Sequence, residues 1–237
     1  MTGTSPMRPM AVLAAVLTLS VSLGGCVSLL PQAKPAQLYR FGTGEGTPRP
    51  EANDARGVTL APVSFPREAM GDGILTMEAE QASYITGARW VAPATVLFRQ
   101  TLDRSFDTAA PRTHLLGRGE VGRSNAILDL DVSRFEARYS DPKSAPTIQI
   151  TVMARLAAAD GSPIGVQVFD VSKPAAANRV GAIVAAYDQA TVEATTALAR
   201  WVEENTPDTP RVGAQSSTSQ ATSTKSTTTS TTTTRKP

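Results

Sequence analysis

The sequence predicts an α+β fold in which two helices pack on one face of an antiparallel sheet. Strands are indicated by apolar residues that alternate with polar ones over 128–132, and again over 148–156 and 164–168. Helices are indicated by two segments in which apolar residues recur at steps of three and four. Because elements with one apolar face must bury that face against each other, we expect two layers around one core.

The first predicted strand, over 58–65, is rich in β-favouring residues, although Pro62 suggests an edge strand or a bulge. Short strands are expected at 74–77 and 83–85.

The alternation that begins at 128 is broken by Phe135, which predicts a bulge or a strand end near Arg134. Asp160-Gly161 supplies a tight turn between the last two alternating segments, so these are expected to form a hairpin. On its return strand the alternating apolar residues are Ile164, Val166 and Val168.

Two amphipathic helices are predicted. Pro93 suits the first turn of the earlier helix, where a missing N–H costs nothing. The later helix ends before Pro207. The apolar stripe of the earlier helix is Trp90, Ala94, Leu97, Phe98, Leu102 and Phe106, and that of the later one is Val180, Ile183, Val184, Tyr187, Thr191, Ala194, Leu198 and Trp201.

The first residues predict export. Arg8 is the only charge ahead of an apolar stretch over 11–23, and about 13 residues are too few for the roughly 20 that span a membrane. Residues 1–25 therefore read as a signal peptide. The stretch Leu23-Gly24-Gly25-Cys26 resembles the bacterial lipobox, so the chain is expected to be cut just before Cys26, the only cysteine, which is expected to carry the lipid. The alternatives are an ordinary signal peptide or a buried structural thiol.

The mature chain divides into three parts. Proline and glycine punctuate residues 26–56, so this part is expected to be a flexible lead from the lipid, with strand character only at Gln37 to Phe41. Residues 57–206 form the α+β domain. Residues 207–237 end in a run of serine and threonine with nothing to bury, which predicts a disordered tail.

Composition and motifs argue against several functions. The full chain carries a formal charge of +2, too little to indicate nucleic-acid binding. His114 is the only histidine, so neither a catalytic triad nor a zinc site can be assembled. Asp129 and Asp131 are expected on the solvent side of their strand, rather than as paired catalytic carboxylates. We therefore expect no enzyme, no metal and no cofactor.

Glycines at 117, 119 and 122 satisfy G-x-G-x-x-G, but the residues that follow indicate a strand, whereas a nucleotide site needs a helix there. This segment is predicted to be a hinge-like loop. The phosphate-binding G-x-x-x-x-G-K-[ST] is missing from the sequence, so the chain is not the ATPase of a transporter.

Besides the lipobox, several features follow one another in a recognisable order: Tyr39-Arg40-Phe41, Val63 and Pro66 in the early strand, Tyr84, Arg89-Trp90, the strand over 129–135, and a final Ala-rich helix. This order resembles the ABC-type transport auxiliary lipoprotein family, the partners of transporters that carry lipids or solvents between two membranes with MCE-domain subunits. The chain departs from the family where Phe65-Pro66 leads into Arg67-Glu68-Ala69-Met70 instead of a Tyr-Leu segment. The resemblance implies a fold similar to the amino-terminal domain of TolB, a periplasmic location and a non-catalytic role.

Three functions then compete. The first is an auxiliary component that binds MCE and ABC transporter subunits through a sheet edge or the strand–helix junctions, with a homo-oligomer compatible with that role. The second is a periplasmic lipid chaperone with its own apolar cavity, and the third is an envelope enzyme. Trp90 and Trp201 are expected in the core, with an interface or lipid groove as the alternative. Since no aspartate follows Cys26, we expect the periplasmic side of the outer membrane.

Overall fold

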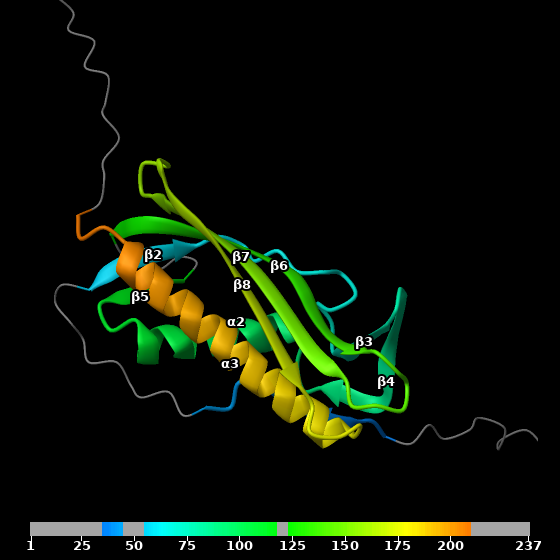
Figure 1. The fold of residues 1–237 in the computed structure, drawn as a ribbon. Helices are drawn as coiled ribbons and strands as arrows, with labels where there is room; N and C mark the ends of the chain where they lie inside the picture. Colours follow the sequence, from blue (N-terminus) through cyan, green and yellow to red (C-terminus); the bar gives the residue numbers. More distant parts are fainter. Residues whose placement is uncertain (1–34, 45–54, 118–122, 210–237) are drawn as a thin grey trace, which may run out of the picture.

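The computed structural model describes residues 35–44, 55–117 and 123–209. Within these ranges, eight strands form one sheet, and two helices pack on one of its faces (Figure 1). The α+β class is therefore confirmed. The elements in chain order are β1 (Gln37–Tyr39), β2 (Arg56–Leu60), β3 (Gly73–Glu78), β4 (Gln81–Trp90), α2 (Ala94–Ala109), β5 (Thr113–Leu116), β6 (Ser124–Tyr139), β7 (Thr147–Ala158), β8 (Pro163–Pro174) and α3 (Val180–Asn205).

The long strand β6 organises the sheet. One of its edges pairs with β7, which pairs in turn with β8, all antiparallel. Its other edge is shared by β2 near one end and β3 near the other, both parallel to it. β5 lies parallel to β2, while β4 lies antiparallel to β3 and parallel to β1. The sheet is thus mixed, and the prediction of an antiparallel sheet is wrong for these four parallel pairs. Alternation in a sequence identifies a strand but not the direction of its partner.

The space between the sheet and the helices is filled by aromatic side chains. The ring of Phe135 on β6 lies 5.4 Å from that of Phe41 and 5.2 Å from that of Tyr187 on α3. It also lies 6.4 Å from the ring of Phe98 on α2. Both helices therefore cover the same face of β6. The register of β6 against β7 shifts between Val132 and Arg134, which confirms the predicted bulge and lets Phe135 reach the core.

The predicted flexible lead needs correction over residues 35–44. β1 pairs with the end of β4, and Phe41 is fully buried, 4.9 Å from the ring of Trp90. The backbone N–H of Gly42 donates to the Asp188 carboxylate at 2.5 Å, and its carbonyl accepts from Arg104. Proline and glycine made this segment resemble a linker, but one buried aromatic residue holds it to the core.

Trp90 also lies outside its predicted element. It ends β4, and helix α2 begins at Ala94, with Pro93 as the residue before it. Trp90 therefore matches the helical spacing of the apolar residues after it only by chance, because it belongs to a strand. The short strands expected at 74–77 and 83–85 are the centres of the longer β3 and β4, which form a hairpin. The strand expected over 58–65 ends at Leu60, before Pro62.

Arg56 holds the C-terminal end of α3. Its buried guanidinium donates to the carbonyl oxygens of Thr206 at 2.5 Å and Glu203 at 2.8 Å, and it lies 3.2 Å from the Glu203 carboxylate. A cation is favourable there because the last carbonyls of a helix are unpaired and carry negative partial charge. Asn125 on β6 donates to the carbonyls of Pro207 and Asp208 at 3.0 Å each. These contacts join β2, β6 and the end of α3.

The predicted hairpin over 148–168 is confirmed as β7 and β8, with Gly161 at a φ of +84° in the turn. Ile164 packs against the core, but after the register shift beside it the return strand faces the opposite way from the alternation expected. Buried Val152 of β7 pairs with Phe169, and buried Ile150 pairs with Val171, so the odd-numbered residues of β8 from Gly165 onward face the helices. Val166 and Val168 therefore lie on the outer face of the sheet.

Candidate functional site

The outer face of β8 carries exposed apolar side chains at the edge of the sheet. Val166 is 61% exposed and Val168 is 51% exposed. They pair with Arg155 and Met153 of β7, so Met153 lies beside Val168 on the same face. Among the described strands, β8 pairs with β7 alone, which leaves its other backbone edge without a neighbouring strand. We call Met153, Val166 and Val168 the β8 patch.

Packing on the inner face determines which side of β8 is exposed. A Cβ at Gly165 would lie 3.3 Å from the ring of Trp201 on α3, and the Trp201 ring lies 6.2 Å from that of Phe169. Trp201 therefore lies against the inner face of β8 and fills the space there. Beside the patch, Arg155 forms an ion pair with Asp129 at 3.3 Å. The β8 patch thus has an apolar centre and a charged border, which is the composition of many protein interfaces.

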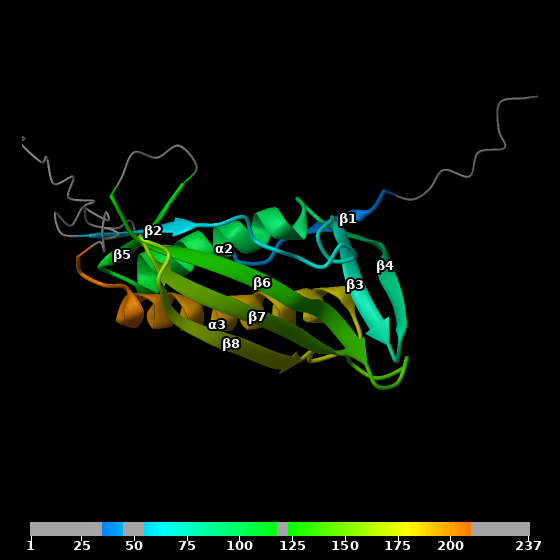
Figure 2. The same ribbon diagram turned by 90° about the horizontal axis from the view of Figure 1, so that it is seen from above.

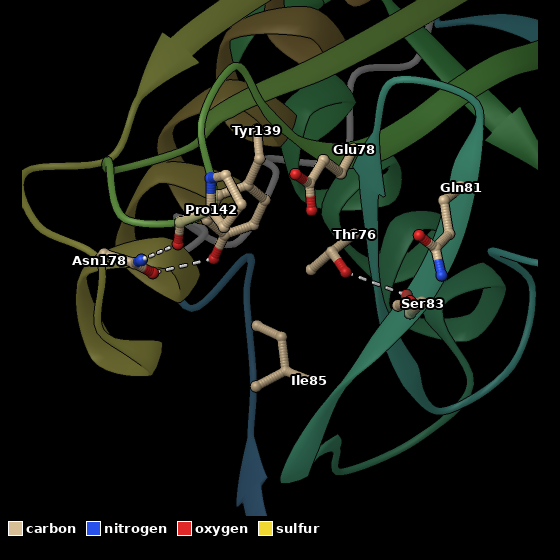
Figure 3. Close-up of a pocket in the computed structure, with 8 residues that line it drawn as sticks. All are labelled: Thr76, Glu78, Gln81, Ser83, Ile85, Tyr139, Pro142 and Asn178. Carbon is tan, nitrogen blue, oxygen red and sulfur yellow. Dashed lines mark hydrogen bonds between the residues drawn. The ribbon is translucent and has the colours of Figure 1, made fainter.

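A second surface feature is a hollow of about 440 Å³ between the β3–β4 hairpin and the end of β6 (Figure 3). Thr76 and Glu78 face it from β3, and Gln81 and Ser83 face it from β4. These four residues form two cross-strand pairs on one face of the hairpin. Across the hollow, the Tyr139 hydroxyl donates to the Asn178 side chain at 2.9 Å, and burial raises the pKa of Tyr139. The lining is suited to hydrogen bonding.

The chemistry of this hollow is limited by its residues. Its lining contains one carboxylate, Glu78, and neither histidine nor cysteine. Over the described ranges, no group of three or more His, Cys, Asp or Glu side chains is placed to hold a metal ion. The helices of the described residues include none that is long and apolar enough to cross a membrane.

The residues singled out in the sequence lie apart from one another. Trp90 is only 2% exposed and its ring lies 5.2 Å from that of Tyr187, so it belongs to the core rather than to a groove. Trp201 is half-buried against β8. Cys26 lies outside the described residues, so its lipidation stays a prediction. Asp129 and Asp131 are both half-buried on the outer face of β6, as expected from the alternation.

The glycine motif at 117–122 lies partly outside the described residues, since residues 118–122 are not described. Strand β5 ends just before it and strand β6 begins just after it, so the expected strand, rather than a helix, follows the glycines.

Sequence reasoning missed the β8 patch because β8 contains two apolar sets, one on each face. Its sequence from 166 to 171 reads Val-Gln-Val-Phe-Asp-Val. One set contains Val166 and Val168, and the other contains Phe169 and Val171. The available signal was this surplus of apolar residues, because a strand with one solvent face normally has a single apolar set.

Comparison with known proteins gives the family. A sequence profile of the family described as ABC-type transport auxiliary lipoprotein component matches residues 39–199. The crystal structure of a protein from Xanthomonas campestris is 26% identical, with a TM-score of 0.61, and the similarity covers 72% of this chain and 96% of that one. A second crystal structure, of an uncharacterized protein, is 16% identical with a TM-score of 0.56, covers 71% and 99% of the two chains, and shows the fold alone.

No curated protein matches the sequence. The profile nevertheless extends from β1 into α3, and so includes both helices and every strand between them. The resemblance seen in the sequence is confirmed, and the chain belongs to the ABC-type transport auxiliary lipoprotein component family.

Proposed function

We propose that the protein is a lipid-anchored, non-catalytic partner of an ABC transporter with MCE-domain subunits, which moves lipids or solvents between the inner and outer membranes. Membership of the family links the chain to ABC-type transport. The proposal adds the MCE partner, the lipid at Cys26 and a position on the periplasmic side of the outer membrane. The absence of an aspartate after Cys26 supports that position.

The observation that carries the proposal is the β8 patch. An edge strand offers unpaired N–H and C=O groups to another chain, and natural proteins usually protect such edges with charge or proline. Here the exposed side chains at the centre of the edge include two valines, Val166 and Val168, on the outer face. A partner can add a strand to β8 while its own apolar side chains cover Met153, Val166 and Val168. The MCE subunit is the partner we assign to this edge.

The alternative, a lipid chaperone, is less well supported by the packing. A carrier of acyl chains needs an apolar cavity, whereas the space between sheet and helices holds the close-packed rings of Phe41, Trp90, Phe98, Phe135 and Tyr187. Four hollows formed by the described residues have volumes from 190 to 620 Å³, and all four are open to the surface. Lipid retained after purification of the protein without its anchor would favour the chaperone instead.

Cross-linking in cells tests the partner. A photoreactive phenylalanine analogue at Val168 is expected to capture an MCE-type subunit on illumination. The matched control is the same analogue at Val96, an exposed valine on α2, which should capture none. Capture of peptidoglycan enzymes alone, or equal capture from both positions, would contradict the proposed contact. Capture of a second copy would show that β8 is used for self-assembly.

The transport role has its own test. Deletion of the protein should weaken the envelope barrier to detergents and solvents without changing hydrolytic activities. Metabolic labelling with a palmitate analogue should mark the native protein and not Cys26→Ser, since a hydroxyl cannot replace the thiol as lipid acceptor. A barrier that stays intact after deletion would count against the role, and label on the mutant would count against the anchor.

A further inference from the structure

A second apolar surface lies at the end of the domain where the described chain begins, far from the C-terminal end of α3 (Figure 2). Its exposed side chains are Leu38 on β1, Met70 before β3 and Tyr84 on β4, which are 63%, 44% and 54% exposed. These three are among the nine large hydrophobic side chains that the described residues leave exposed. We call them the β1–β4 patch.

The strand register shows that Leu38 and Tyr84 share a face. Leu38 pairs with Arg89, and Arg89 pairs with Gly73, so these three positions lie side by side on one face of the sheet. A Cβ at Gly73 would lie 2.6 Å from the ring of Tyr84, so this ring covers Gly73 on that same face. The Tyr84 hydroxyl then donates to the carbonyl of Glu68 at 2.9 Å, which holds the ring in place.

Met70 joins this surface through a hollow of about 570 Å³. The hollow is lined by the segment from Arg67 to Gly73 and by β4 from Tyr84 to Arg89. Its charges balance: two arginines, at 67 and 89, accompany Glu68 and Asp72, and Arg89 is paired with Asp72 at 2.8 Å. The formal charges of the hollow therefore cancel, and the exposed apolar side chains of the patch lie beside polar groups. It is the face of the β3–β4 hairpin opposite to the one that lines the polar hollow of Figure 3.

The length of the chain before β1 limits how far this end can lie from the anchor. Nine residue steps separate Cys26 from Pro35, where the described chain begins. Even fully extended, they span at most about 30 Å. Helix α3, with 26 residues, is about 39 Å long and carries the chain to the opposite end of the domain. Because the tether is shorter than this helix, the end with the β1–β4 patch is the one held near the lipid.

We propose that the β1–β4 patch lies on the surface of the bilayer that holds the Cys26 lipid. This inference rests on the proposed anchor, and it adds the face of the domain that meets the membrane. A tyrosine with an apolar ring and a polar tip suits the boundary between headgroups and acyl chains. Arginines can extend apolar stems along that boundary while their charge stays in water. Leu38 and Met70 add the apolar area that makes the contact favourable.

Site-specific fluorescence tests the orientation on the full lipoprotein in vesicles of phosphatidylethanolamine and phosphatidylglycerol. Leu38→Cys and Met70→Cys are labelled with a polarity-sensitive dye. Val166→Cys and Val168→Cys are the controls, because these valines are exposed to a similar extent at the β8 edge. Since an interfacial face enters about 5–10 Å into the headgroup region, lipids carrying a nitroxide quencher there should quench the first pair at least about twofold more than the controls.

Equal quenching at all four positions, or stronger quenching at the controls, would overturn the orientation. A blue shift at Leu38 and Met70 without lipid quenching would also overturn it, because it would show that protein, such as a second copy, covers the patch. The protein without an introduced cysteine distinguishes a wrong orientation from a missing lipid anchor. Its only cysteine, Cys26, takes no dye when lipidated, whereas labelling of this protein would show that the anchor itself is missing.

Discussion

The two ends of the domain are held by different kinds of contact. At the end near the patch of Leu38, Met70 and Tyr84, Phe41 is buried between the rings of Trp90 and Phe135. At the other end, Arg56 binds the last carbonyls of α3 and the carboxylate of Glu203. Aromatic burial does not depend on pH, whereas the Arg56 contact weakens when Glu203 is protonated. The stability of the Arg56 end is therefore expected to respond to acid through Glu203.

The largest effect is expected from Phe41→Ala, which should lower the free energy of unfolding by about 4 kcal/mol, because it removes a fully buried aromatic ring. Urea unfolding measures it. Leu38→Ala is the control from the same segment, and because Leu38 is exposed it should change stability by less than about 0.5 kcal/mol. Similar small losses for both variants would show that the segment is the linker that its composition suggested.

At the other end, Arg56→Ala should cost about 3 kcal/mol, because Arg56 is buried and its loss leaves the Glu203 carboxylate and the helix carbonyls with fewer partners. The matched control is Arg155→Ala. That arginine also pairs with a carboxylate, Asp129, but both partners are half exposed, so the loss should stay below about 1 kcal/mol. Equal costs would mean that the Arg56 cluster does not hold α3.

Acid should weaken the Arg56 end through Glu203. Burial alone would raise the pKa of Glu203, but hydrogen bonds from Thr113 and Arg112 and the charge of Arg56 outweigh it and lower the pKa below the ordinary value of 4.5. The ionised form therefore stabilises the fold above pH 4.5, and this contribution is lost as the pH falls through the lowered pKa.

Glu203→Gln isolates this effect. The variant should be less stable than the native protein at neutral pH, and the difference should shrink as the pH falls below 4.5. Asp103, whose pKa is raised by burial, contributes with the opposite sign, but it is present in both proteins and cancels in the comparison. A difference in stability that does not change with pH would exclude a role for the charge of Glu203.

The smallest effect is expected in the β3–β4 hairpin. Ser83→Ala alters an exposed side chain at the polar hollow, and it should change the free energy of unfolding by less than about 0.5 kcal/mol. Hydrogen exchange gives the complementary measurement, because the amides of β4 before Gly87 should exchange faster than those of β6. Strong protection throughout β4 would show that the hairpin is covered in solution.

The sequence was sufficient for the elements whose pattern has one interpretation. The turn at Asp160-Gly161 and the phase break at Phe135 were both predicted and are both present. Strand directions were not predictable, because the parallel pairing of β2 and β3 with β6 depends on connections that leave no local pattern. Phe41 was missed for a related reason. Its burial depends on Trp90 and Phe135, which are distant in the sequence.

The candidate surfaces were harder to predict than the fold. In β8, Gly165 decides which side faces the helices, because it leaves space for the ring of Trp201. These two residues are 36 positions apart, so no local pattern in the sequence shows their contact. Tyr84 appeared in the sequence only as one member of the family resemblance, and its exposure follows from its place over Gly73. Binding surfaces of this kind are exposed apolar residues, and the alternation rule by itself assigns such residues to the core.

The short strand β1 also has a mechanical consequence. Any pull on the chain from its N-terminal side reaches the domain through this three-residue strand and Phe41, whereas a pull from the C-terminal side is received by α3, Arg56 and Asn125. A force applied between the two ends is therefore carried in series through elements of unequal strength. Of these, β1 has the fewest backbone partners, so under load the chain should detach there first, while the β6–β8 sheet and both helices remain folded.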